Sequence, residues 1–172
     1  MFPDFPLLVF RCSDANRKFH PIFLAIIYEE TFVMLDVIFD KFVEICKEQN
    51  IKLNLTSLTA DMAPQFESLI ANKYSKTKSL HCWFHVKNAM IKDLEKLKTL
   101  SDLVIWDLVI LKGVPSKKVF TYMFGLFKEK YKNFQNCTDY LSNFEKLRID
   151  NNNNWFEGTS VHAPSTNCAI ES

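Results

Sequence analysis

Residues 53–90 read LNLTSLTADMAPQFESLIANKYSKTKSLHCWFHVKNAM and show the most regular pattern in the chain. Leu53 to Leu58 favours a short β-strand, and Asp61 follows at the point where that strand would reach solvent. Pro64 suits the first turn of a helix, because the N–H that it lacks has no partner there. Apolar residues then recur at helical spacing on one face: Phe66, Leu69, Ile70 and Tyr74. The pattern predicts a strand, an acidic strand end and a helix, with Asp61 as the first candidate for chemistry.

A Cys-x-x-His pair follows this unit. Ser79 to Phe84 predicts a second short strand, and Cys82 and His85 lead from it into another helix. Zinc takes four protein ligands in structural sites and three in catalytic ones, so one pair does not make a zinc site. On a strand, His81 would point to the face opposite Cys82. We interpret Cys82 and His85 as packing and orienting groups, with metal ligation as the alternative.

The chain before this unit predicts a hairpin and a helix. Phe5 to Cys12 and Phe19 to Tyr28 are apolar runs joined by a polar turn, which is typical of two paired strands. Pro21 offers no N–H to a ladder and therefore indicates a strand start or a sheet edge. From Thr31 onward the apolar period changes to that of an amphipathic helix, with one stripe formed by Leu35, Ile38, Phe39, Phe42, Ile45 and Cys46.

The chain after this unit is helical in pattern from Val86 to Leu147. Helices are expected around Leu103 to Leu111, from Val119 to Tyr131 and from Cys137 to Leu147. Four asparagines between Asp150 and Trp155 predict a loop. Lysines gather on one side of the middle helix, and we expect them to be solvated, with phosphate contact as the alternative: Lys117, Lys118, Lys128 and Lys130.

Bulk properties restrict the class of protein. The 172 residues are 48% hydrophobic with 16 Phe, which excludes a disordered chain and predicts one globular unit. A net charge of +1 gives no basic field, so net charge does not indicate nucleic-acid binding. Five scattered cysteines suggest reduced thiols. No leader sequence and no apolar run of membrane-spanning length is visible, and we therefore expect a soluble intracellular protein that does not associate with a membrane.

Two separated blocks resemble the transposases of Mutator-like elements (MULE). Asp61 with Ala63, followed by Cys-Trp-Phe-His-Val-Lys-Asn-Ala from Cys82 to Ala89, is similar to the central block of that family. Asn154-Trp155-Phe156-Glu157-Gly158 and the segment Pro164 to Ser172 resemble the block that carries its last catalytic glutamate. The resemblance covers most of the chain, loosely between the blocks, and is incomplete at both ends.

The resemblance implies an α/β fold with a mixed sheet of ribonuclease-H-like order. Residues 1–98 would form the core, residues 99–150 an all-helical insertion, and residues 151–172 a loop and the start of the final catalytic helix. Asp61 would be the second of three catalytic carboxylates and Glu171 the third, both ligating metal, with Cys82 and His85 supporting the site. The activity implied is cleavage and strand transfer of DNA during transposition, with Mg²⁺ or Mn²⁺ rather than zinc, DNA at transposon ends as partner, and a nuclear location. A homo-oligomer is left open.

The first strand of that fold, with the first catalytic aspartate, is not visible in this sequence. It would lie in the sheet between the strand from Phe5 and the strand before Asp61, and it would precede Met1. Asp4 and Asp14 are poor substitutes, since prolines flank Asp4 and Asp14 belongs to the predicted turn. We therefore expect a fragment of such a transposase that is inactive as this chain. The alternatives are a domesticated DNA-binding or protein-interaction module, and an unrelated α/β protein.

Overall fold

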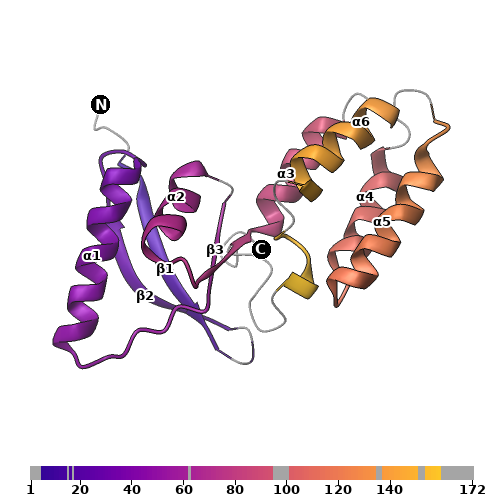
Figure 1. The fold of residues 1–172 in the computed structure, drawn as a ribbon. Helices are drawn as coiled ribbons and strands as arrows, with labels where there is room; N and C mark the ends of the chain where they lie inside the picture. The colour runs from indigo at the N-terminus through magenta and orange to yellow at the C-terminus, as the bar shows by residue number, and fades with distance from the viewer. Residues whose placement is uncertain are drawn as a thin grey trace. The chain divides into compact units, whose positions relative to one another are not determined.

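The computed structural model of the chain is a mixed α/β structure with helices and two small sheets (Figure 1). Contacts divide it into two compact units, Met1–Ser79 and Leu80–Ser172, which corrects the expectation of one globular unit. The physical reason is that each unit has its own core, as described below. The structure describes residues 5–14, 16, 18–61, 63–94, 101–134, 137–150 and 154–159.

The first unit begins with the predicted hairpin. Strands β1 (Leu7–Ser13) and β2 (Phe19–Ile26) pair antiparallel, with Leu7 opposite Ile26 at the open end. The register shifts after Phe10, so that Arg11 lies opposite Pro21. A bulge at this place accommodates a proline, because the missing N–H no longer interrupts a regular ladder. Pro21 is the third residue of β2, and β2 is an edge strand of a two-stranded sheet, so the prediction of a strand start or a sheet edge is confirmed.

Helix α1 (Phe32–Glu48) forms where the sequence predicts it. Thr31 is its N-cap, and the Thr31 hydroxyl accepts a hydrogen bond from the Met34 N–H at 3.3 Å. The buried stripe follows the predicted spacing: Leu35, Ile38, Phe39, Phe42 and Cys46. Ile45 is the exception, with 36% of its surface exposed, because it lies at the margin of the stripe.

Strand β3 (Ser57–Ala60) starts later than predicted, and residues 53–56 lie outside it. Its partner β4 (Lys78–His81) has only four residues, which limits the length of the ladder. The ladder begins where the Lys78 N–H donates to the Thr56 carbonyl at 3.0 Å, so among the described residues those before Thr56 have no strand to pair with in this sheet. Helix α2 (Pro64–Lys73) begins with Pro64 as predicted. A strand therefore leads to Asp61, as expected, although it is shorter.

The core of the first unit lies between its strands and its two helices. Leu35, Phe39 and Leu69 are buried at its centre, and partly buried side chains pack against them from β1, β3 and the two helices: Leu8, Phe10, Phe32, Leu58, Phe66 and Tyr74. Phe10 of β1 meets Phe39 edge to face, with ring centroids 5.0 Å apart. Strands β1 and β3 thus contribute to one core, yet among the described residues they belong to separate two-stranded sheets.

The second unit is mainly helical. Helix α3 (Trp83–Leu94) begins earlier than predicted, so the expected strand Ser79–Phe84 ends at His81. The Val86 N–H donates to the Cys82 carbonyl at 3.1 Å, and this bond commits Cys82 to the helix start. The expectation of alternating faces assumed that Cys82 lies on the strand, and the structure places Cys82 outside β4; His81 and Cys82 are both buried.

The remaining helices follow the predicted order. They are α4 (Ser101–Lys112), α5 (Lys117–Tyr131) and α6 (Cys137–Phe144), which continues as a π-helical turn over Glu145–Asp150, and a short 3-10 turn follows at Glu157–Thr159. The Ser116 hydroxyl caps α5 by accepting from the Val119 N–H. None of the described helices is long and apolar enough to cross a membrane. The division into a core of residues 1–98 and an insertion of residues 99–150 stays a prediction.

Candidate functional site

Asp61 lies directly after β3, and Ala60 before it is buried. Asp61 does not cap the next helix, because the N-cap of α2 is Ala63 and no side chain bonds there. Within the described part of the chain, the Asp61 Oδ1 is buried and has no hydrogen-bond partner. Leaving a buried acceptor without a partner costs about 1–3 kcal/mol, and more for a charged group. Such an atom is best explained by a cation, a water molecule or a donor that the fold holds for it.

The chemistry of Asp61 fits one position of a magnesium site. A carboxylate oxygen is a hard ligand of the kind that Mg²⁺ and Mn²⁺ prefer. However, the described residues contain no group of three or more His, Cys, Asp or Glu side chains that could hold a metal ion. They therefore supply one candidate ligand, Asp61, and not a complete metal centre.

Cys82 and His85 lie together at the start of α3, in the second unit. Cys82 is fully buried, and its carbonyl accepts the first hydrogen bond of the helix. His85 is half-buried and meets the Phe84 ring edge to face at 5.6 Å. The His85 Nδ1 is buried without a hydrogen-bond partner in the described residues. Asp61 belongs to the first unit, whereas Cys82 and His85 belong to the second. The geometry of each part of the predicted site is therefore given for its own unit.

The other predicted carboxylates differ in outcome. Glu171 and Asp4 lie outside the described residues. Asp14 is a turn residue as predicted, because its Oδ1 accepts hydrogen bonds from the N–H groups of Asn16 and Lys18, both at 2.9 Å. Its Oδ2 lies 3.1 Å from the His20 Nε2. The Lys18 N–H bond, followed by the His20 bond, lowers the pKa of Asp14 below its usual value. Its carboxylate is therefore used within the turn.

The segment around Trp155 has a structural role that the sequence did not reveal. Trp155 is only 1% exposed and stacks on Trp83, with ring centroids 5.7 Å apart. Its indole N–H donates to the Arg148 carbonyl at 2.9 Å. The Asn154 carbonyl accepts from the His81 N–H at 2.9 Å. The described parts of the two separated blocks of the resemblance are thus in direct contact. In the sequence, the signal for this contact was the presence of a tryptophan in each block, Trp83 and Trp155.

Glu157 and Gly158 attach the same segment to the loop between α4 and α5. Glu157 pairs with Lys112 at 2.6 Å, and both side chains are largely buried. The Gly158 N–H donates to the Val114 carbonyl at 2.8 Å. A Cβ at position 158 would lie 2.5 Å from the Ser116 nitrogen, so only glycine fits this close approach. In this chain Glu157 acts in an ion pair of the helical unit.

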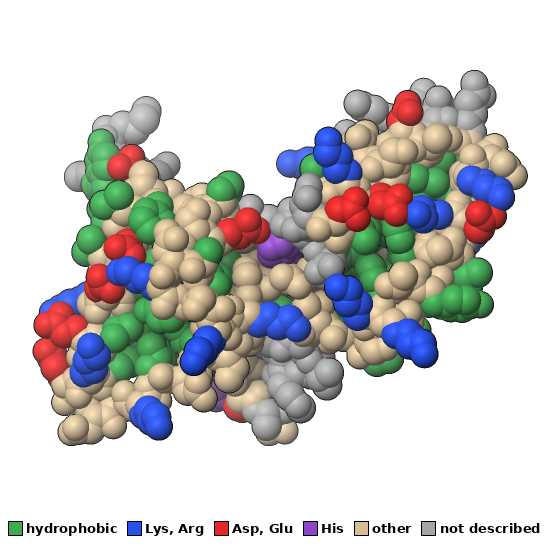
Figure 2. Space-filling view, viewed as in Figure 1, with side chains coloured by type: hydrophobic (Ala, Val, Ile, Leu, Met, Phe, Trp, Pro, Cys, Tyr) green, Lys and Arg blue, Asp and Glu red, His purple; other side chains and the backbone are tan. Residues whose placement is uncertain are grey.

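The lysines of α5 fall into two pairs. Lys128 binds Glu145 and Lys130 binds Asp107, each at 2.6 Å, whereas Lys117 and Lys118 are exposed at the helix start. The hydrogen bond to Asp107 raises the pKa of Lys130. Figure 2 shows acidic side chains beside lysines over the helices of this unit. The charge available to a phosphate backbone is therefore smaller than the number of lysines indicates.

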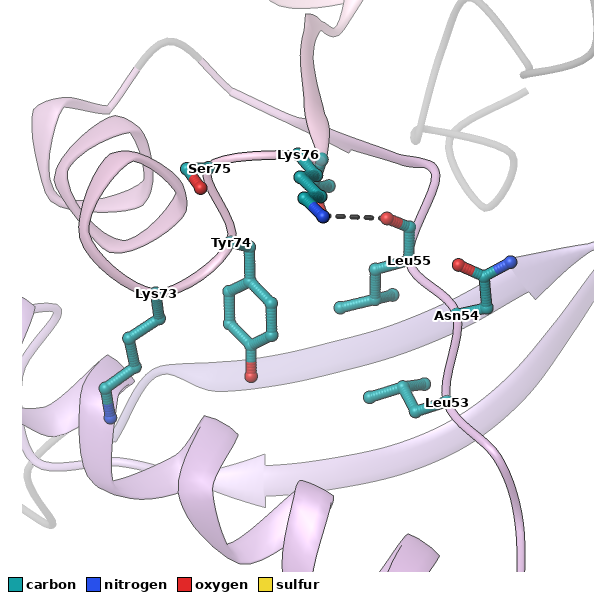
Figure 3. Close-up of a pocket in the computed structure, with 8 residues that line it drawn as sticks. Leu53, Asn54, Leu55, Lys73, Tyr74, Ser75 and Lys76 are labelled. Carbon is teal, nitrogen blue, oxygen red and sulfur yellow. Dashed lines mark hydrogen bonds between the residues drawn. The ribbon is translucent and has the colours of Figure 1, made fainter.

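A pocket of about 270 Å³ lies in the first unit, between residues 53–55 and residues 73–77. In Figure 3 the side chains of Tyr74 and Leu55 face one another across it. Two lysines line it, and one of them, Lys73, is already bound to Asp36 at 2.6 Å and Asp40 at 2.7 Å, bonds that raise the pKa of Lys73. Because Lys73 is held by two carboxylates, its charge is not available to an anion in the pocket.

Comparison of the chain with protein-family models, with curated proteins and with solved structures finds no match. The family resemblance therefore rests on the residues quoted above, and the site on its own geometry.

Proposed function

We propose that this chain is a portion of a MULE-like transposase, with a ribonuclease-H-like core in which Asp61 is the second metal-ligating carboxylate and Glu171 the third. The ancestral activity is cleavage and strand transfer of transposon DNA in the nucleus, with Mg²⁺ or Mn²⁺. The observation that carries the proposal is the Asp61 carboxylate, which stands at the end of β3 with a buried oxygen that has no hydrogen-bond partner among the described residues.

The strand arrangement supports the same proposal. The ribonuclease-H-like order requires one further strand between the strand from Phe5 and the strand before Asp61. Side chains of β1 and β3 pack on the same core, but the two strands belong to separate sheets among the described residues. A strand paired with both β1 and β3 would join them in one sheet over this shared core, as the proposed fold requires.

The contact between the two sequence blocks is a second support. Trp83 belongs to the block that resembles the centre of the family, and Trp155 to the block before its last glutamate. The two rings stack on each other, and the His81 N–H donates to the Asn154 carbonyl, so the two blocks pack together in the folded chain. A chance similarity of either block would not require them to pack together.

When bound, divalent metal ions in such a site activate the attacking oxygen and stabilise the leaving oxygen of a phosphodiester. In this chain, Asp61 would hold one of them through its Oδ1. Because the described residues hold no group of three ligating side chains, we expect weak metal binding and little or no DNA cleavage by the chain itself.

A domesticated interaction module is the second candidate. It is favoured by large apolar side chains that α4 and α5 leave exposed, among them Trp106 and Tyr122, each 68% exposed. Single exposed apolar residues are normal, but two large aromatic side chains on neighbouring helices suit a protein partner. On this reading Asp61 binds no metal.

Mn²⁺ binding by the purified chain separates the two candidates. We expect Mn²⁺ to bind weakly, with the binding lost in Asp61→Asn and retained in Glu48→Gln, which removes an exposed carboxylate from the same unit. Binding that survives Asp61→Asn, or no binding at all, would reject the metal-ligand role. A nicking assay on labelled duplex DNA follows. Cleavage that Asp61→Ala abolishes would show that a complete carboxylate set exists within this chain.

A further inference from the structure

The outer face of the β1–β2 hairpin is apolar and exposed. Residues directly opposite in the ladder share a face, so Leu7 with Ile26 and Val9 with Leu24 lie on one side. On this side Leu7 is 58% exposed, Leu24 60% and Ile26 76%. The other side carries Leu8, Phe10, Phe23 and Ala25, of which Phe10 and Phe23 contact Phe42 of α1. Among the described residues of the first unit, helix α1 therefore covers one face of the hairpin and leaves the other exposed.

Three neighbouring residues extend the exposed face. Ile22, at the bulge, is 51% exposed, while Phe5 and Tyr28 at the open end are 48% and 73% exposed and contact each other at 6.2 Å. We define the outer face as Phe5, Leu7, Val9, Ile22, Leu24, Ile26 and Tyr28. At about 100 Å² of exposed apolar surface for each of its six larger exposed side chains, it presents roughly 600 Å². That is at the upper limit for an apolar patch on a monomer, and such patches mark interaction sites.

The charges at the two ends of the outer face are opposite. The exposed Lys18 lies toward the turn between the strands, where the Asp14 carboxylate is already used by backbone N–H groups and His20. Glu29 and Glu30 are exposed at the open end, next to Tyr28. A surface with an apolar centre and ends of opposite sign is complementary to itself, and a two-fold interface requires such self-complementarity.

We propose that the outer face binds a second copy of this chain, so that two hairpins pack face to face in a symmetric dimer. A standard interface buries about 800 Å² on each partner. The apolar residues supply most of that area, and the charged ends supply the rim. Two sheets packed in this way lie about 10 Å apart, with their inner side chains interdigitated. This proposal is independent of the transposase assignment, because it uses no catalytic residue.

The charges also select the direction of the two-fold axis. If the axis ran along the strands, Lys18 would meet Lys18 and the glutamates would meet glutamates. An axis in the plane between the sheets and perpendicular to the strands instead places Lys18 of one copy over Glu29 and Glu30 of the other. Because like charges opposed across an interface are unfavourable, the second arrangement is the one proposed.

Sedimentation velocity of the full chain tests the dimer. We expect a monomer–dimer equilibrium at roughly micromolar concentration. Leu24→Lys and Ile26→Lys should each raise the dissociation constant at least about tenfold, since each buries an unpaired cation. Both side chains are exposed in the monomer, so circular dichroism should show an unchanged fold. The matched control is Val37→Lys, at a residue of α1 that is 60% exposed and lies outside the outer face, which should leave the dissociation constant unchanged.

Charge reversal tests the orientation. Glu29→Lys with Glu30→Lys should weaken the dimer roughly threefold or more, and adding Lys18→Glu should restore part of the lost affinity. A chain that stays monomeric to about 100 μM, a dimer insensitive to Leu24→Lys and Ile26→Lys, or a dimer broken by Val37→Lys would overturn the proposal. Failure of the triple charge variant to recover any affinity would overturn the perpendicular axis.

Discussion

Trp83 and Trp155 stack with their ring centroids 5.7 Å apart and their planes 21° apart. Trp155 also meets the edges of Phe120 at 5.4 Å and Phe144 at 6.2 Å. One side chain near the end of the described chain therefore joins α3, α5 and α6. The helical unit depends on a segment that by composition alone reads as a loop.

Replacing Trp155 should severely destabilise the second unit. Trp155→Ala should lower the free energy of unfolding by about 3–5 kcal/mol, because a fully buried indole leaves a cavity and the Arg148 carbonyl loses its donor. Urea denaturation followed by circular dichroism measures this. The control is Trp106→Ala, at a side chain that is 68% exposed, and it should change the free energy of unfolding by less than about 0.5 kcal/mol. Equal costs for the two variants would contradict the buried position of Trp155.

Alanine substitutions at two glycines should change the stability of the protein in opposite directions. Gly158→Ala should destabilise the protein by more than about 2 kcal/mol, because its Cβ would lie 2.5 Å from the Ser116 nitrogen and 2.6 Å from the Pro115 carbonyl carbon, both backbone atoms. Gly125→Ala, within α5, has no atom within 4 Å of the added Cβ. It should stabilise the protein by about 0.5–1 kcal/mol through helix propensity. Thermal unfolding of both variants decides this, and a shift of the same sign in both would count against the close approach.

The turn of the hairpin should make stability depend on acid pH. The pKa of Asp14 is lowered, first by the Lys18 N–H bond and then by His20, so folding favours its charged form. The stabilisation is present above the usual aspartate pKa of about 3.9 and is lost as the pH falls through the lower pKa of the folded state. Between about pH 5 and about pH 3, the wild type should lose more stability than Asp14→Asn. Parallel pH profiles for the two proteins, measured by urea unfolding, would be incompatible with a lowered pKa.

The spacing of residues close in sequence was enough to predict most elements. The apolar stripe from Leu35 to Cys46 indicated α1, Pro64 marked the start of α2, and the runs flanking Asp14 predicted the hairpin. These features depend on side chains within one or two turns of each other, and that distance is visible in a sequence. Asp61 was singled out for the same reason, since it follows a short β-favouring run.

The errors concern features that a distant partner decides. Strand β3 was expected over residues 53–58 and forms over Ser57–Ala60, because the ladder extends only as far as β4 provides a partner. The strand expected to include Cys82 ends at His81, because α3 begins at Trp83. Local propensity could not predict either strand boundary, because both depend on which backbone groups find hydrogen-bond partners in the folded chain.

The amino-acid order alone therefore defined the helices, the hairpin and the carboxylate at a strand end, because these follow from periodicity and backbone preference. The separation into two units, the packing of Trp155 on Trp83, the requirement for glycine at 158 and the exposure of the outer face came only from the tertiary structure. Each of these depends on contacts between residues far apart in the chain, or on their absence. Such contacts form only when burial and hydrogen bonding are satisfied for the whole chain at once.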